Sequence, residues 1–66
     1  MLRRYFVNYQ ELELSDFSKQ FLAAYREANN ESLSCRAFLS LMDAMRNGCI
    51  IDIIDARFFI EATQCD

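Results

Sequence analysis

The N-terminal segment carries large side chains at alternate positions. Tyr5, Val7 and Tyr9 occupy every second residue, and a two-residue period places them on one face of an extended chain. We therefore predict a strand over about Arg3 to Tyr9. Because a single strand is not stable alone, its partner is expected to be the isoleucine-rich run near residue 50 or the same strand of a second copy.

The spacing becomes helical after Ser15, which is a favourable N-cap residue. The apolar stripe that follows consists of Phe17, Phe21, Ala24, Tyr25 and Ala28. Lys19, Arg26 and Glu27 lie off this stripe, so the pattern predicts an amphipathic helix over about Asp16 to Ala28. Asn29 and Asn30 are expected to end it, because Asn tolerates the left-handed conformation found at helix C-termini.

A second amphipathic helix is predicted to begin at Ser34. Leu33 before this cap and Phe38 after it are placed to touch as a hydrophobic staple. The expected buried face consists of Cys35, Phe38, Leu41, Met42 and Met45. Asn47 and Gly48 supply the stop signal.

The segment from Cys49 to Ala62 is the most apolar part of the chain. Its only polar positions are Asp52, Asp55, Arg57 and Glu61. We favour a helix over about Ile53 to Thr63, because Asp52 can cap its first turn. A β-branched run such as Ile50 to Ile54 also suits a buried strand, and periodicity alone does not decide between the two.

These elements predict a mainly α fold: a short N-terminal strand, a helical hairpin and a third, very apolar C-terminal segment. There is no proline, repeat or linker, and Gly48 is the only glycine. We therefore expect residues 1–66 to form one small domain.

The apolar content predicts association. The chain has 66 residues, of which 53% are hydrophobic, including six Phe and three Tyr. So short a chain buries only about 60% of its unfolded surface. We therefore predict a homodimer or a protein partner, and the residues expected to form the partner or dimer interface are Ile50, Ile51, Ile54, Phe58 and Phe59.

The charge and the residue types of the chain argue against nucleic-acid binding and against most catalytic and metal sites. The net charge is −3 and the acidic excess lies after Asn47, whereas nucleic-acid binding depends on Lys and Arg. With no His and one Gly, the chain lacks an imidazole base, a Cys/His metal set and a glycine-rich phosphate loop. We expect an acidic, non-enzymatic protein with no catalytic residues, no cofactor and no metal, and no role in nucleic-acid binding.

The three cysteines, Cys35, Cys49 and Cys65, show no CxxC spacing and follow no signal-like pattern. We interpret them as reduced thiols, with Cys35 and Cys49 in the core and Cys65 open to oxidation between chains. No apolar run is long enough for a membrane span. Because reduced thiols are typical of the cytoplasm, we expect a cytoplasmic location.

The order strand, helix, Asn-containing link, helix over Glu11 to Gly48 resembles the ribbon-helix-helix proteins, which are dimeric DNA-binding regulators. The resemblance implies a ribbon built from two chains that reads base edges. Arg3, Arg4 and Arg36 would then contact DNA or another anion. With Leu12 and Leu14 facing inward, however, Glu11 and Glu13 would face the DNA.

We therefore predict a small protein–protein interaction module that acts as a regulator, inhibitor or assembly factor. A ribbon-helix-helix-like transcriptional regulator is the alternative.

Overall fold

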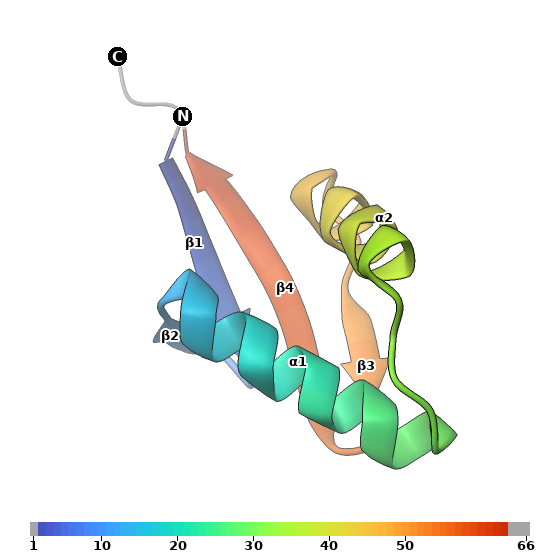
Figure 1. Cartoon of the computed structure of the whole chain (residues 1–66). Helices are drawn as coiled ribbons and strands as arrows, with labels where there is room; N and C mark the ends of the chain where they lie inside the picture. The colour runs from blue at the N-terminus through green and yellow to red at the C-terminus, as the bar shows by residue number, and fades with distance from the viewer. Residues whose placement is uncertain (1, 64–66) are drawn as a thin grey trace.

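The computed structural model describes residues 2–63. In chain order the elements are β1 (Leu2–Val7), β2 (Gln10–Leu12), α1 (Leu14–Asn29), α2 (Cys35–Arg46), β3 (Ile51–Ile53) and β4 (Ala56–Thr63). The strands form one antiparallel sheet in the order β2-β1-β4-β3. Both helices lie on the same face of this sheet (Figure 1). The protein is therefore a two-layer α+β domain.

The predicted mainly α fold is wrong, and the error lies in the C-terminal segment. Residues 51–63 form two strands rather than a helix. Ile51 and Ile53 pack against the core, and Phe58 and Ile60 are buried in it. The period of this segment is thus two, and Asp52 lies within a strand instead of capping a helix.

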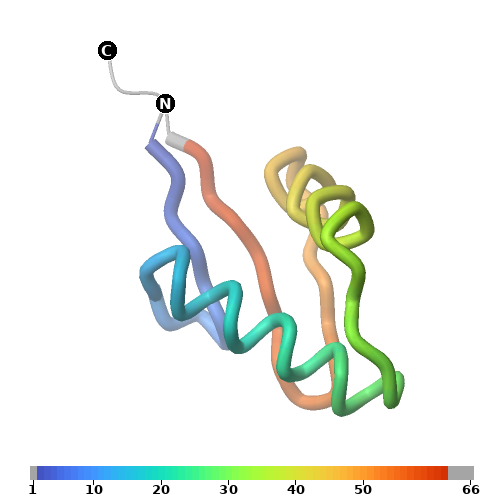
Figure 2. The backbone as a smooth tube through the Cα atoms, viewed as in Figure 1, coloured from blue at the N-terminus to red at the C-terminus, as the bar shows by residue number. Residues whose placement is uncertain are grey.

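β1 and β4 form the centre of the sheet. Tyr5 pairs with Ile60 and Val7 with Phe58, so the strand predicted from alternation is present and its partner is β4 of the same chain. The strand ends at Val7 rather than at the predicted Tyr9, which lies in the following turn. Figure 2 shows these two strands side by side although they come from opposite ends of the sequence.

Two tight turns lie at the same end of the sheet. Asn8 and Tyr9 connect β1 to β2, and both have positive φ, 50° and 68°. Two-residue hairpin loops favour such angles because they match the twist of the strands. The turn from β3 to β4 consists of Ile54 and Asp55, and Ile54 has a φ of 56°. A β-branched residue is strained in this region.

Both predicted helices are present. α1 begins at Leu14, before the expected start, with Glu13 at its N-cap and no side-chain cap bond. The expected cap at Ser15 is therefore wrong. The start of α2 is as predicted: the Ala37 N–H donates to Ser34 Oγ at 3.2 Å. Beyond its C-terminus, Gly48 takes a φ of 102°.

The core lies between the helices and one face of the sheet. Its buried side chains are Val7, Phe17, Phe21, Met42, Met45, Phe58 and Ile60. The ring of Phe58 stands edge-on to those of Phe17 and Phe21, with centroid separations of 5.8 and 5.0 Å. β4 therefore supplies the residue on which α1 packs.

The cysteines are not part of this core. Cys35 and Cys49 are exposed, which contradicts their predicted burial. Cys65 lies outside the described residues. No helix within residues 2–63 has the length and apolar character needed to cross a membrane.

Candidate protein-interaction surface

The two faces of the sheet differ because side chains alternate along each strand. The face turned away from the helices is called the open sheet face here. It includes Leu2, Arg4, Phe6, Glu11, Asp52, Arg57, Phe59 and Glu61. The helices leave this face in contact with solvent (Figure 1).

Aromatic side chains form the centre of the open sheet face. Phe6 and Phe59 are register partners on the two central strands. Their rings are stacked, with centroids 5.0 Å apart and an interplanar angle of 9°. Tyr9, from the neighbouring turn, contacts Phe59 at 5.5 Å and 57°. Phe6 and Phe59 are only partly buried, so an apolar centre remains accessible.

The first ion pair beside this centre joins the two strands of the β1–β2 hairpin. Arg4 Nη2 donates to Glu11 Oε1 at 2.9 Å. This hydrogen bond is the main cause that lowers the pKa of Glu11 and raises the pKa of Arg4. The Arg4 guanidinium also lies 5.5 Å from the Phe6 ring centroid, in cation–π range.

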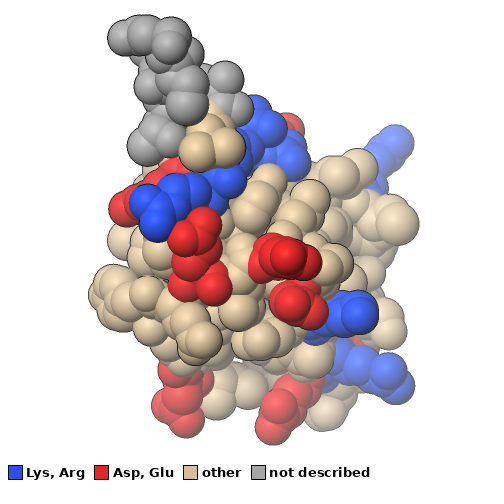
Figure 3. Space-filling view, turned by 90° about the vertical axis from the view of Figure 1, so that its left-hand side faces the viewer, with Lys and Arg blue, Asp and Glu red and all other residues tan. Residues whose placement is uncertain are grey.

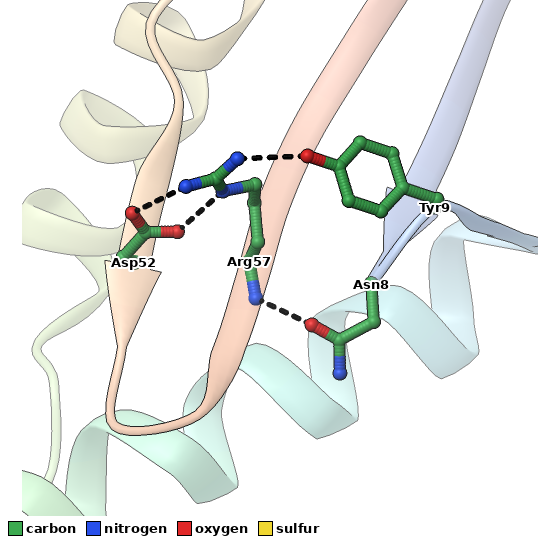
Figure 4. A network of polar contacts seen from close by, with 4 residues as sticks. All are labelled: Asn8, Tyr9, Asp52 and Arg57. Atoms are coloured by element: carbon green, nitrogen blue, oxygen red, sulfur yellow. Dashed lines mark hydrogen bonds and ion pairs between the residues drawn. The ribbon is translucent and has the colours of Figure 1, made fainter.

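A second cluster of polar contacts forms on the other side of the aromatic centre, around Arg57 (Figure 4). Arg57 Nε and Nη2 donate to Asp52 Oδ1 and Oδ2 at 2.9 and 3.3 Å, and Nη1 donates to the Tyr9 hydroxyl at 2.7 Å. The hydrogen bonds that Asp52 accepts from Arg57 are the main cause that lowers the pKa of Asp52. The same bonds are the largest cause that raises the pKa of Arg57, and the bond to the Tyr9 hydroxyl is the second largest. The guanidinium is held in place by two strands and one turn.

The structure separates the five residues predicted to mediate association. Ile50 and Ile54 are exposed, at 58% and 60%. Ile51 is partly buried against the core, and Phe58 is 1% exposed at its centre. Phe59 lies on the open sheet face. Phe58 therefore acts in folding and does not contribute to an accessible surface.

The arginines of the DNA-binding alternative lie on different elements. Arg3 and Arg4 belong to β1, whereas Arg36 lies in the first turn of α2. The strand at Gln10–Leu12 pairs with β1 of its own chain, so it does not need a second chain to form a ribbon. On the side drawn in Figure 3, basic and acidic side chains are mixed rather than gathered by sign.

Sequence reasoning did not assign Phe6, Tyr9 or Arg57 to an interaction surface. The alternation of Tyr5 and Val7 already places Phe6 on the opposite face of the strand. An outward position on a strand is usually polar, so the aromatic side chain of Phe6 was a signal of a binding surface that the sequence already contained.

Comparison of the chain with protein-family models, with curated proteins and with solved structures gives no match.

Proposed function

We propose that the protein is a small, non-enzymatic protein–protein interaction module that binds its partner through the open sheet face and acts as a regulator, inhibitor or assembly factor. The observation that carries this proposal is the Phe6–Phe59 stack at the centre of the uncovered face. Aromatic residues with a polar surround are typical of binding hot spots between proteins.

The electrostatics of this face favour a protein over a nucleic acid. Arg4 and Arg57 are already bound to Glu11 and Asp52, so neither offers a free charge to a phosphate. The stacked rings of Phe6 and Phe59 turn their faces toward each other. Base stacking needs an accessible ring face, which this geometry reduces.

The test is affinity capture from cells with the wild-type chain and with Phe59→Ser and Phe6→Ser. Both variants should lose the captured protein, because each removes half of the stack. Leu39→Ser is the matched control: Leu39 is 59% exposed on α2, on the helical side of the molecule. Circular dichroism must show that all three variants remain folded.

The expected result is one protein whose capture depends on Phe6 and Phe59, resists nuclease and survives Leu39→Ser. Failure to capture any protein in this way would contradict the proposal. Salt-sensitive binding to duplex DNA that requires Arg3, Arg4 and Arg36 would instead support the DNA-binding alternative.

A further inference from the structure

β3 lies at one edge of the sheet, so some of its backbone N–H and C=O groups point away from the neighbouring strand β4. Ile53 and Ala56 flank a two-residue loop and form its hydrogen-bonded pair, which makes Asp52 and Arg57 the next, non-hydrogen-bonded pair. The Arg57 backbone confirms this, because its C=O accepts from the Asn8 N–H at 2.9 Å on the opposite side of β4. The N–H and C=O of Asp52 therefore point to the free edge of the sheet.

The two edges of the sheet are protected to different degrees. β2 carries Glu11 and is followed directly by Glu13, and like charges oppose pairing with a second β2. β3 is short, but it has no Lys or Pro, and its only charge, Asp52, is bound to Arg57. Exposed isoleucines flank it on both sides. The β3 edge is thus the one open to pairing.

The sequence around this edge is symmetric. Ile50-Ile51-Asp52-Ile53-Ile54 is the same in both directions about Asp52. An antiparallel pair centred on Asp52 places Ile50 opposite Ile54 of the second copy, and Ile51 opposite Ile53 of the second copy. A two-fold interface requires this kind of self-complementarity. An unrelated partner would have no reason to match it.

We propose that β3 pairs antiparallel with β3 of a second copy about a two-fold axis at Asp52, which joins two sheets into one. This inference goes beyond the proposed function, because it uses the sheet edge and leaves the open sheet face free for a different protein. The dimer and the partner complex can therefore be tested separately, and either proposal can be wrong without the other.

Arg57 reduces the charge repulsion that this register creates between the two chains. The two Asp52 carboxylates lie opposite each other at the axis, where like charges destabilise a pair of strands. Each carboxylate is neutralised within its own chain by the two hydrogen bonds from Arg57. The Arg57 guanidinium is in turn held by the Tyr9 hydroxyl.

Ile54 supplies an independent reason to expect contact at this edge. It is 60% exposed and its φ is 56°, so it leaves apolar surface in water and also occupies a strained conformation. The strain is a local property of the turn, whereas the exposed apolar surface is the feature that contact with a second copy can change. Contact with Ile50 of the second copy removes the exposure of both side chains, which gives the dimer a net apolar gain.

Sedimentation equilibrium over a range of concentrations tests the dimer. The wild-type chain should dimerise, and Ile50→Lys should raise the dimer Kd by more than about tenfold. Leu39→Lys, an equally exposed control on α2, should leave the dimer Kd unchanged. A chain that stays monomeric at every concentration, or a dimer that survives Ile50→Lys, would overturn the proposal.

The register has its own test. Arg57→Met leaves two unneutralised carboxylates at the axis and should raise the Kd by about tenfold, whereas Arg57→Met combined with Asp52→Asn should restore it. A double variant as weak as Arg57→Met would refute the Asp52-centred register. Partner capture that persists in Phe59→Ser, together with a dimer that Ile50→Lys weakens as expected, would count against the proposed function alone.

Discussion

The side chain of Asn8 continues the β1–β4 hydrogen-bond ladder beyond the end of β1. The Asn8 N–H donates to the Arg57 C=O at 2.9 Å, and the Arg57 N–H donates to Asn8 Oδ1 at 2.9 Å. In an ordinary antiparallel pair the second bond would go to the Asn8 carbonyl. Asn8 has a φ of 50° as the chain turns toward β2, and its amide oxygen takes that place. Figure 4 shows this contact beside the Asp52–Arg57–Tyr9 cluster.

We predict that Asn8→Gly lowers the free energy of unfolding by about 0.5–1.5 kcal/mol, the usual net value of one hydrogen bond. Glycine keeps the positive φ and loses only the amide. Asn8→Ala should cost about 1–2 kcal/mol more, because alanine also resists the left-handed region. Urea denaturation measures both. Equal stability of the two variants would show that the turn exerts no backbone constraint at Asn8.

Ile54 leads to a prediction of the opposite sign. Ile54→Asn should raise the free energy of unfolding of the monomer by about 1 kcal/mol, because asparagine tolerates a positive φ better than a β-branched residue does. Ile50→Asn is the matched control, since Ile50 is equally exposed but has no positive φ. Denaturation at concentrations below the dimer Kd provides the comparison. A similar gain in both variants would mean that strain at Ile54 is negligible.

The helices could be predicted because their signals are local. The Ser34 cap and the Met42 and Met45 face need only the spacing within one helix, and both are as expected. Phe17 and Phe21 likewise fall on one stripe and are fully buried. Tertiary contacts strengthen these helices, but the sequence alone is enough to identify them.

The C-terminal hairpin could not be predicted because its signals conflict. Its loop has Ile54 and Asp55 where an Asn-Gly or Gly-containing pair would announce a turn. Phe59 is apolar on the outward face, which hides the alternation of Phe58 and Ile60. Because the segment was read with a helical period, buried Phe58 was grouped with exposed residues such as Ile50. The pairing of β4 with β1 shows that Phe58 faces the core and Phe59 faces the open sheet face.

The aromatic core gives a third prediction. Phe21→Ala should destabilise by about 3–5 kcal/mol, because its ring is fully buried and contacts Phe17, Phe38 and Phe58. Phe38→Ala should cost less, since Phe38 is only partly buried. Thermal and urea unfolding would check the order. A larger loss for Phe38 would place the centre of the core between the helices rather than on β4.

The last prediction concerns acid. Asp52 has a lowered pKa in the folded chain, chiefly because it accepts hydrogen bonds from Arg57. A carboxyl with a lower pKa when folded stabilises the protein above its unfolded pKa, near 4, and this contribution is lost as the pH falls through the folded value. Stability should therefore decline below about pH 4. Asp52→Asn should flatten that decline in urea denaturation between about pH 2 and 5. Identical slopes in wild type and Asp52→Asn would show that the Asp52–Arg57 pair does not contribute to folding, because a group that titrates alike in both states adds no pH dependence.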